Sequence, residues 1–161
     1  AVVFDAYGTL FDVGSAAEML AAVLAQVDAT DVFIAVAAVA DYTPATPREQ
    51  KVKKSDAPLT LELTPTVDIL GTVAARRGAP FCVGFAAESH DVDRHADEKR
   101  RRKGIPLIIA NRAQDALGRP DNEVTLLDDA GRHPLPRMDK LALARHLVGE
   151  IATRLPRPTS N

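Results

Sequence analysis

Apolar residues in this chain gather in short runs that predict the strands of a sheet. Runs of Val, Ile, Leu and Phe cover residues 32–36, 81–85 and 106–110. Continuous apolar runs of this length are typical of parallel strands that are covered on both faces. At residues 58–63 leucines alternate with polar residues, which predicts a half-buried strand. That strand adjoins a polar, proline-containing loop, so we expect it to form an antiparallel arm.

The first helix is predicted by a capping box. Ser15 is followed three residues later by Glu18, and residues 16–27 are rich in alanine and leucine. With the preceding run at residues 1–13 and the strand at 32–36, this helix makes a β-α-β unit. Its crossover is expected to be right-handed.

Two further helices have recognisable ends. Thr66 is expected to cap a helix over residues 67–77, whose start presents free backbone N–H groups to a ligand. A charged helix is predicted over residues 92–103, and Gly104, directly after it, is expected to end it.

The carboxy-terminal part predicts a hairpin and a long helix. The turn-rich stretch 115–122 leads into a strand at 123–127, and a short piece near Pro134 pairs with that strand about Gly131. Residues 138–155 form an amphipathic helix. Its predicted apolar side consists of Leu141, Ala144, Leu147, Val148 and Ile151.

These elements alternate between strands and helices, which indicates an α/β fold. We expect a three-layer, Rossmann-like, mostly parallel sheet with helices on both faces, plus the β-arm and the carboxy-terminal hairpin and helix. A length of 161 residues suits one domain, here residues 1–155. Residues 156–161 are expected to be a flexible tail.

Composition and charge exclude several classes of protein. The chain is 46% apolar and 26% charged, as in ordinary globular proteins. A net charge of −2 gives no overall attraction to nucleic acid or anionic lipid, so any anion site must be local. No apolar run is long enough to span a bilayer, and the first residues do not resemble a signal peptide. The single cysteine, Cys82, lies in an apolar run and is expected to be an inert, packed thiol in a reducing cytoplasm.

The most informative stretch is residues 31–54. The strand at 32–36 runs into small residues, Ala37 and Ala38, that allow a ligand to approach the backbone. Asp41 stands where the strand should end, the usual place for ligand chemistry in open α/β sheets. A proline-broken loop then delivers Lys51, followed by two more lysines. A carboxylate able to hold a divalent metal, facing mobile amines, suits a triphosphate.

Three motifs resemble one family. AAVADY at residues 37–42, K-x-K-K at 51–54 and GFAAE at 84–88 are similar to phosphopantothenoylcysteine synthetase, the ligase half of the bifunctional coenzyme A biosynthesis protein. The resemblance covers residues 12–155 and corresponds to the carboxy-terminal half of that synthetase. The family's amino-terminal part supplies a glycine-rich turn and an asparagine that do not occur here.

The resemblance implies a reaction. Such synthetases use CTP with Mg²⁺ to activate 4′-phosphopantothenate as an acyl-cytidylate, which the amine of cysteine then attacks. Lys51 is implied as the catalytic residue and Asp41 as the ligand of nucleotide and metal. The other implied nucleotide-binding residues are Ala37, Ala38, Val67, Asp68, Ile69, Leu70, Phe85, Lys99 and Lys103. We expect this chain to bind CTP but to form little amide by itself.

Two of these assignments have alternatives from the residues alone. Lys99 and Lys103 are four apart and project from one helix face, yet a basic run on a helix is often solvated surface or a nucleic-acid patch. Phe85 suits stacking on a base and core packing equally. The resemblance also implies a homodimer formed through the arm and a decarboxylase domain in the parent protein.

Two other functions stay open. Residues 1–13 form an atypical first strand and resemble the opening of haloacid dehalogenase-type hydrolases, in which a strand-end aspartate, here Asp5, is the nucleophile. The chain also suits a non-catalytic nucleotide-binding or dimerisation domain.

Overall fold

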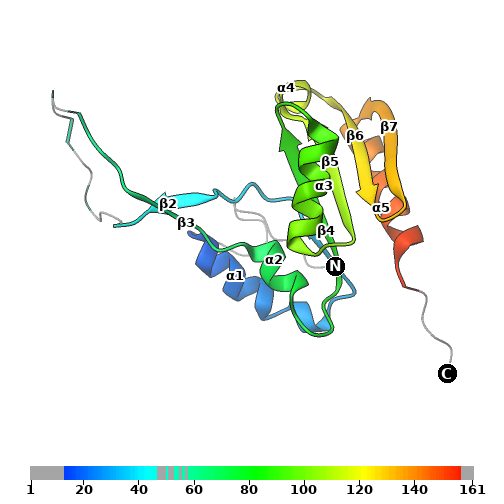
Figure 1. Cartoon of the computed structure of the whole chain (residues 1–161), viewed down its shortest axis with the longest axis horizontal. Coiled ribbons are helices and arrows are strands. Elements are labelled where there is room, and N and C mark those ends of the chain that lie inside the picture. Colours follow the sequence, from blue (N-terminus) through cyan, green and yellow to red (C-terminus); the bar gives the residue numbers. More distant parts are fainter. Residues whose placement is uncertain (1–12, 47–49, 51–52, 55, 57, 157–161) are drawn as a thin grey trace. The chain divides into compact units, whose positions relative to one another are not determined.

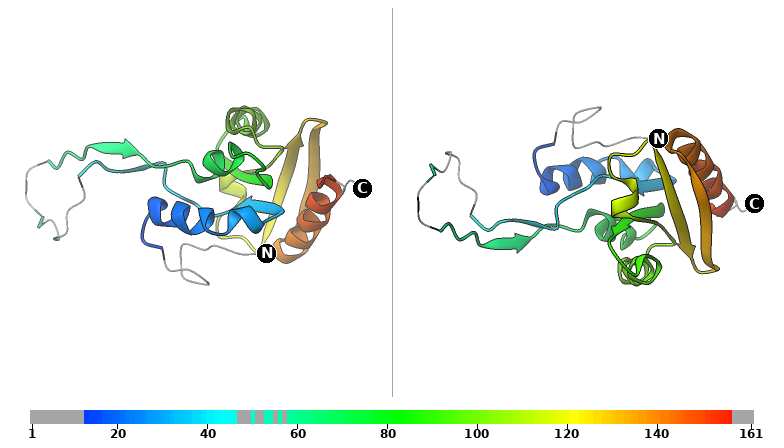
Figure 2. Two further views of the ribbon diagram at one scale, coloured as in Figure 1. Left: turned by 90° about the horizontal axis from the view of Figure 1, so that it is seen from below. Right: turned by 90° about the horizontal axis from the view of Figure 1, so that it is seen from above.

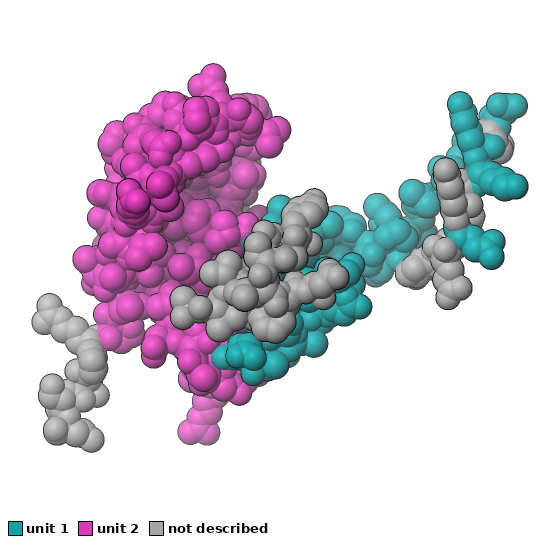
Figure 3. Space-filling model, turned by 180° about the vertical axis from the view of Figure 1, so that it is seen from behind, with its two compact units in different colours: residues 1–26, 37–69 teal, residues 27–36, 70–161 magenta. Residues whose placement is uncertain are grey.

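The chain forms two compact units, which Figure 3 shows in different colours. The computed structural model describes residues 13–46, 50, 53–54, 56 and 58–156. One unit, here the arm unit, falls within residues 1–26 and 37–69. The other, the sheet unit, falls within residues 27–36 and 70–161. That residues 1–155 form a single domain stays a prediction.

The sheet unit contains a five-stranded mixed sheet (Figure 1). Its strands, in spatial order, are β1 (Val32–Ala35), β4 (Phe81–Glu88), β5 (Leu107–Arg112), β6 (Asp121–Asp128) and β7 (Gly131–Asp139). The first three are parallel, and β6 and β7 add an antiparallel hairpin. The predicted α/β class and the predicted hairpin are therefore confirmed.

Helix α5 (Lys140–Arg154) covers one face of this sheet. Because side chains alternate along a strand, the register assigns every second residue of β4, β5 and β6 to the same face. That face forms a dry core with α5, whose buried members are Val83, Leu107, Ile109, Val124, Leu126, Leu143, Leu147 and Ile151. This core accounts for every second residue of the central strands. The residues between them, such as Cys82 and Ile108, are buried on the other face, so the runs are apolar throughout.

Helix α3 (Val92–Lys103) covers the opposite face, as Figure 2 shows. It has the predicted bounds, and Gly104 ends it with a φ of 65°. Helix α2 (Ile69–Ala74) packs nearby through Leu70. A Cβ on Gly84 would lie 3.0 Å from Leu70 and 2.9 Å from Ile105, so glycine allows this layer to approach the sheet closely.

The predicted apolar side of the last helix was correct for Leu147 and Ile151 but wrong for the other three residues. Leu141 and Val148 are 60% and 62% exposed, and Ala144 is exposed as well. Asp139 accepts hydrogen bonds from the first N–H groups and starts the helix at Lys140. The helix then turns Leu143, Leu147 and Ile151, spaced four apart, toward the sheet.

Strand β7 is longer than the predicted piece near Pro134. It lies at the edge of the sheet, where a proline costs no ladder hydrogen bond on its free side. Asn122 pairs with Met138 but Val124 pairs with Leu135, so an extra residue of β7 forms a bulge around Pro136. Upstream, a short helix, α4 (Ala113–Ala116), overlaps the start of the turn-rich stretch predicted at 115–122.

Helix α1 (Ala16–Leu24) of the arm unit starts as predicted. The Ser15 hydroxyl accepts a hydrogen bond from the Glu18 N–H at 3.2 Å. The Glu18 carboxylate accepts from the N–H of Gly14, one residue before the position that a capping box uses. The helix ends before Val27, which instead opens the 3₁₀ turn η1 (Val27–Ala29).

The arm unit also contains the predicted antiparallel arm, with different strand bounds. Strand β2 (Tyr42–Pro44) pairs with β3 (Leu63–Pro65). The predicted strand at 58–63 is therefore wrong except at Leu63. Strand β3 starts five residues later and ends two residues later than the strand that the leucine alternation predicted. The Thr66 N–H, just after β3, donates to the Asp41 carbonyl at 2.9 Å and continues the pairing.

Candidate functional site

Asp41 and the segment before α2 lie together in the arm unit. The Thr66 N–H donates to the Asp41 carbonyl, and the Thr66 hydroxyl donates to the Ala40 carbonyl. The predicted cap at Thr66 is wrong, because its hydroxyl is used across the arm and α2 begins only at Ile69. These two bonds place Asp41 beside the neighbour of Val67, so two parts of the predicted nucleotide site meet. The side chains of Asp41, Val67 and Asp68 are exposed, whereas Ile69 is buried.

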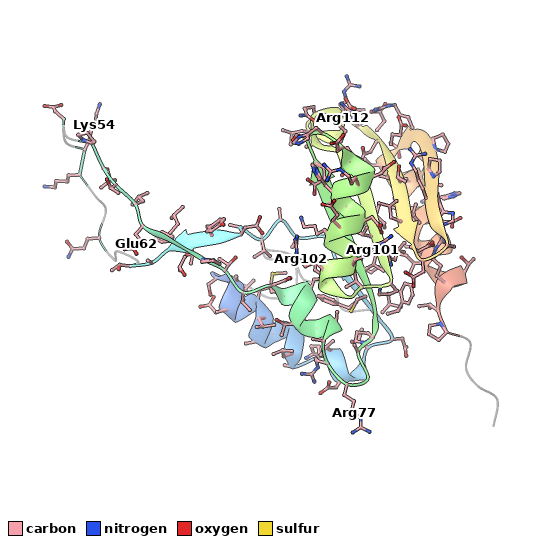
Figure 4. The ribbon with its side chains drawn as sticks, viewed as in Figure 1. Lys54, Glu62, Arg77, Arg101, Arg102 and Arg112 are labelled. Atoms are coloured by element: carbon pink, nitrogen blue, oxygen red, sulfur yellow. The ribbon has the colours of Figure 1, made fainter. Side chains whose placement is uncertain are left out.

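The lysines of the predicted flap belong to the same unit. Lys51, the predicted catalytic residue, lies outside the described residues. Lys53 and Lys54 are described and exposed, and Figure 4 shows Lys54 at the end of the arm, farther out than Glu62. Ala37 is partly buried and Ala38 is exposed, as close approach of a ligand to this backbone requires.

Lys99 and Lys103 lie on α3 in the sheet unit. The ammonium of Lys99 is 3.9 Å from a carboxylate oxygen of Glu88, at the carboxyl end of β4. Lys103 lies one turn further along the helix and is partly buried. Glu88 was not predicted as a partner of Lys99, because the sequence pattern does not specify how β4 and α3 pack against each other.

Phe85 is not brought to these lysines. Its side chain packs against the core cluster on the α5 face, while α3 covers the other face. Core packing, one of the two alternatives for this residue, is therefore what the structure shows. Stacking on a base stays a prediction. Leu70, another predicted contact, is buried in α2.

The residues of the basic run at 99–103 differ in burial and in their partners. Arg100 is only 5% exposed and donates to Asp97 at 2.9 Å and to Asp129 at 2.8 Å. Arg101 pairs with Asp97 at 2.8 Å. The hydrogen bond from Arg100 lowers the pKa of Asp97, helped by Arg101. Figure 4 shows Arg101 and Arg102 on α3. Arg100 therefore anchors α3 in the fold, whereas Arg101 adds an ion pair at an exposed position.

Two grooves flank α3. One has a volume of about 860 Å³ and lies between α3 and the β6–β7 turn. The other, of about 730 Å³, lies toward the end of β5. Arg132, which lines both, pairs with Asp93, and Arg112 lies 3.6 Å from Asp115. In the described part of the chain neither groove is lined by Lys99, Lys103 or Phe85.

Cys82 is buried, as predicted. Burial raises the pKa of its thiol to about 11, so the thiol stays protonated and unreactive near neutral pH. Among the described residues, no three His, Cys, Asp or Glu side chains gather as a metal site. Within the same residues, none of the helices has the length and apolar character to cross a membrane.

These features define an α/β domain with a mixed sheet, a carboxylate after the first strand and two lysines on a helix that covers the sheet. The model of the DNA/pantothenate metabolism flavoprotein C-terminal domain matches residues 5–155. The chain belongs to this family. Among its relatives is the coenzyme A biosynthesis bifunctional protein CoaBC of Bacillus subtilis, 43% identical over 144 residues, 87% of this chain and 36% of the relative.

Solved structures agree with this assignment. The C-terminal domain of a CoaBC protein is 34% identical, with a TM-score of 0.69, over 88% of this chain and 63% of that one. A mutant of Cab2, solved as a complex with phosphopantothenate-cysteine, shares the fold at 20% identity and a TM-score of 0.62, over 76% of this chain and 43% of that one. This chain therefore spans little more than a third of the curated relative and under two thirds of the related domain.

Proposed function

We propose that this chain is part of a CTP-dependent ligase that joins 4′-phosphopantothenate to cysteine through an acyl-cytidylate. The observation that carries the proposal is the family match over residues 5–155, which includes every predicted site residue. The match also includes Asp5, the nucleophile of the hydrolase alternative, which lies outside the described residues.

The residues suit a reaction that depends on neutralising phosphate charge. Lys51 contacts the phosphates of CTP and acts in catalysis, and Lys99 and Lys103 complete the grip. The backbone from Val67 to Leu70 holds the nucleotide, together with Ala37 and Ala38. Contact of Phe85 with the nucleotide stays a prediction from the family resemblance, because its side chain packs on the α5 face of the sheet.

Asp41 is the proposed ligand of Mg²⁺. A single exposed carboxylate fits this ion, because Mg²⁺ usually takes one or two protein carboxylates and fills its other positions with substrate phosphates and water. When bound, the ion neutralises charge on the triphosphate. Asp41 would hold the ion, and the Thr66 N–H ties the Asp41 backbone to the segment before α2.

Amide formation needs more protein than this chain. The chain covers 36% of its Bacillus subtilis relative, and the glycine-rich turn and the asparagine of the synthetase family do not occur in its sequence. We expect CTP binding without efficient ligation. The parent protein of this chain is proposed to carry a decarboxylase domain as well, as a bifunctional protein does.

The arm supports a homodimer. Pairing of Tyr42 with Pro65 and of Pro44 with Leu63 places these four residues on one side of the two-stranded arm. Tyr42 and Leu63 are 60% and 52% exposed. An exposed apolar side of a two-stranded arm suits burial against a second copy. Light scattering should show a dimer for the wild type and a monomer for Leu63→Asp, with Thr64→Asp, on the other side, as control.

Calorimetry of CTP with Mg²⁺ tests the proposed function. The wild type should bind, and Lys51→Ala should weaken binding at least about tenfold, the loss of one strong charged contact. Lys54→Ala, which removes the same charge from the same arm, should change affinity far less. No binding by the wild type, or equal loss in both variants, contradicts the site. A pyrophosphate-release assay with 4′-phosphopantothenate tests catalysis separately.

A further inference from the structure

Among the described residues, the carboxylate paired with Lys99 is that of Glu88. It ends β4 and, by alternation from Gly84, its side chain lies on the face that α3 covers. The exposed fractions of the two side chains are 34% for Lys99 and 23% for Glu88. Both charges therefore lie where water screens them only in part.

The distance between the two charges differs from that of the other ion pairs on α3. Arg100 and Arg101 both lie within 2.9 Å of Asp97, and Arg94 lies 2.9 Å from Glu98. Lys99 and Glu88 are 3.9 Å apart, too far for a hydrogen bond. The carboxylate thus lowers the positive potential at the amine without occupying its N–H groups, which stay available to a ligand.

That arrangement distinguishes between two kinds of phosphate ligand. A metal-free polyphosphate that contacts Lys99 must also approach the Glu88 carboxylate, and the two negative charges repel. A polyphosphate that carries Mg²⁺ has less negative charge and is repelled less. We propose that Glu88 is a specificity-determining residue that makes the Lys99 site prefer magnesium-bound polyphosphate to metal-free polyphosphate. This inference rests on the proposed function.

Pyrophosphate is a suitable probe, because it is a product of the proposed reaction and binds with or without Mg²⁺. Calorimetry should give Glu88→Gln about threefold to tenfold tighter binding of metal-free pyrophosphate than the wild type. Binding of magnesium pyrophosphate should change by less than about twofold. The affinity for magnesium pyrophosphate divided by the affinity for metal-free pyrophosphate should therefore be smaller for Glu88→Gln than for the wild type.

Glu98→Gln is the matched control. Glu98 precedes Lys99 on the same helix, and its removal makes the same change in net charge, but it pairs with Arg94. The Glu98→Gln variant should prefer magnesium pyrophosphate to metal-free pyrophosphate by the same factor as the wild type. In a Lys99→Gln background, Glu88→Gln should no longer tighten binding, because the phosphate no longer contacts this position.

The outcomes separate the two proposals. If the wild type binds neither CTP nor pyrophosphate, the proposed function fails and this inference fails with it. If the wild type binds both, but Glu88→Gln and Glu98→Gln change the preference equally, the inference alone is overturned. Tighter binding by Glu88→Gln that persists without Lys99 overturns it as well. Circular dichroism and urea unfolding of each variant show that it is folded as the wild type is.

Discussion

The two faces of the sheet unit are covered by helices of opposite character. Helix α5 contributes Leu143, Leu147 and Ile151 to a dry core. Helix α3 buries only Ala96 and Arg100 among its twelve residues, and its surface is joined to its surroundings by ion pairs. The α5 face is therefore built for stability, whereas the α3 face combines support with charged groups left near the ends of the parallel strands.

The α3 face shows how one basic run serves both needs. Arg100 points to the β6–β7 turn and is bonded to two aspartates. The ammonium of Lys99, its neighbour, lies 3.9 Å from the carboxylate of Glu88 on β4. Arginine forms several fixed hydrogen bonds, and lysine keeps a mobile point charge. Neighbouring charges in one basic run can therefore differ in whether they are fixed in the fold.

The largest effect should come from the α5 face. Leu147→Ala leaves a cavity in the dry core and should lower the free energy of unfolding by about 2–4 kcal/mol. Val148→Ala, one residue later and exposed, should change it by less than about 0.5 kcal/mol. Urea unfolding followed by circular dichroism measures both. Equal losses would contradict the apolar α5 face described above, because α5 would then present a different side to the sheet.

The arginine part of α3 should give a smaller loss. Arg100→Met keeps most of the buried stem but leaves Asp97 and Asp129 without this guanidinium, at a cost of about 2–3 kcal/mol. The cost stays below that of a fully buried pair, because Asp129 is 92% exposed. Arg101→Met, at an exposed position, should cost less than about 0.5 kcal/mol in the same urea titration. If Arg100→Met leaves the free energy of unfolding unchanged, the ion pairs of Arg100 do not stabilise the α3 face.

The smallest effect depends on pH and involves the end of α5. Burial disfavours the ionised form of Asp128, but hydrogen bonds from Arg154, His133 and the Ala130 N–H outweigh it and lower its pKa from 3.8 to about 2. Ionised Asp128 therefore stabilises the fold fully above pH 4, and this contribution is lost as the pH falls from about 4 to 2. Its size should be about 1–2 kcal/mol after allowance for screening by solvent.

Unfolding by urea at several pH values measures this contribution. Asp128→Asn should be less stable than the wild type at pH 6, and the difference should shrink below pH 3. Asp115→Asn, which removes a more exposed carboxylate, is the control. A difference that stays constant down to pH 2 would show that the hydrogen bonds to Asp128 do not depend on its charge.

Much of the fold was predictable from local pattern. The bounds of α3, the start of α1, the three parallel strands and the hairpin about Gly131 all follow from short-range signals such as caps, apolar runs and turn residues. The same signals, with the family motifs, identified Asp41 and Lys99 as candidates. The structure adds that Asp41 lies against Thr66, close to the predicted Val67 segment.

Other features depended on contacts between distant residues. Arg100 is buried because Asp129, 29 residues away, meets it at the β6–β7 turn. The exposed side of α5, the core position of Phe85 and the register of the arm were decided in the same way. Sequence periodicity specifies that a helix or strand forms, but the direction in which it turns its side chains is set by what packs against it. The sequence by itself therefore determined the elements and the family, and the tertiary structure decided which charges and apolar groups face inward.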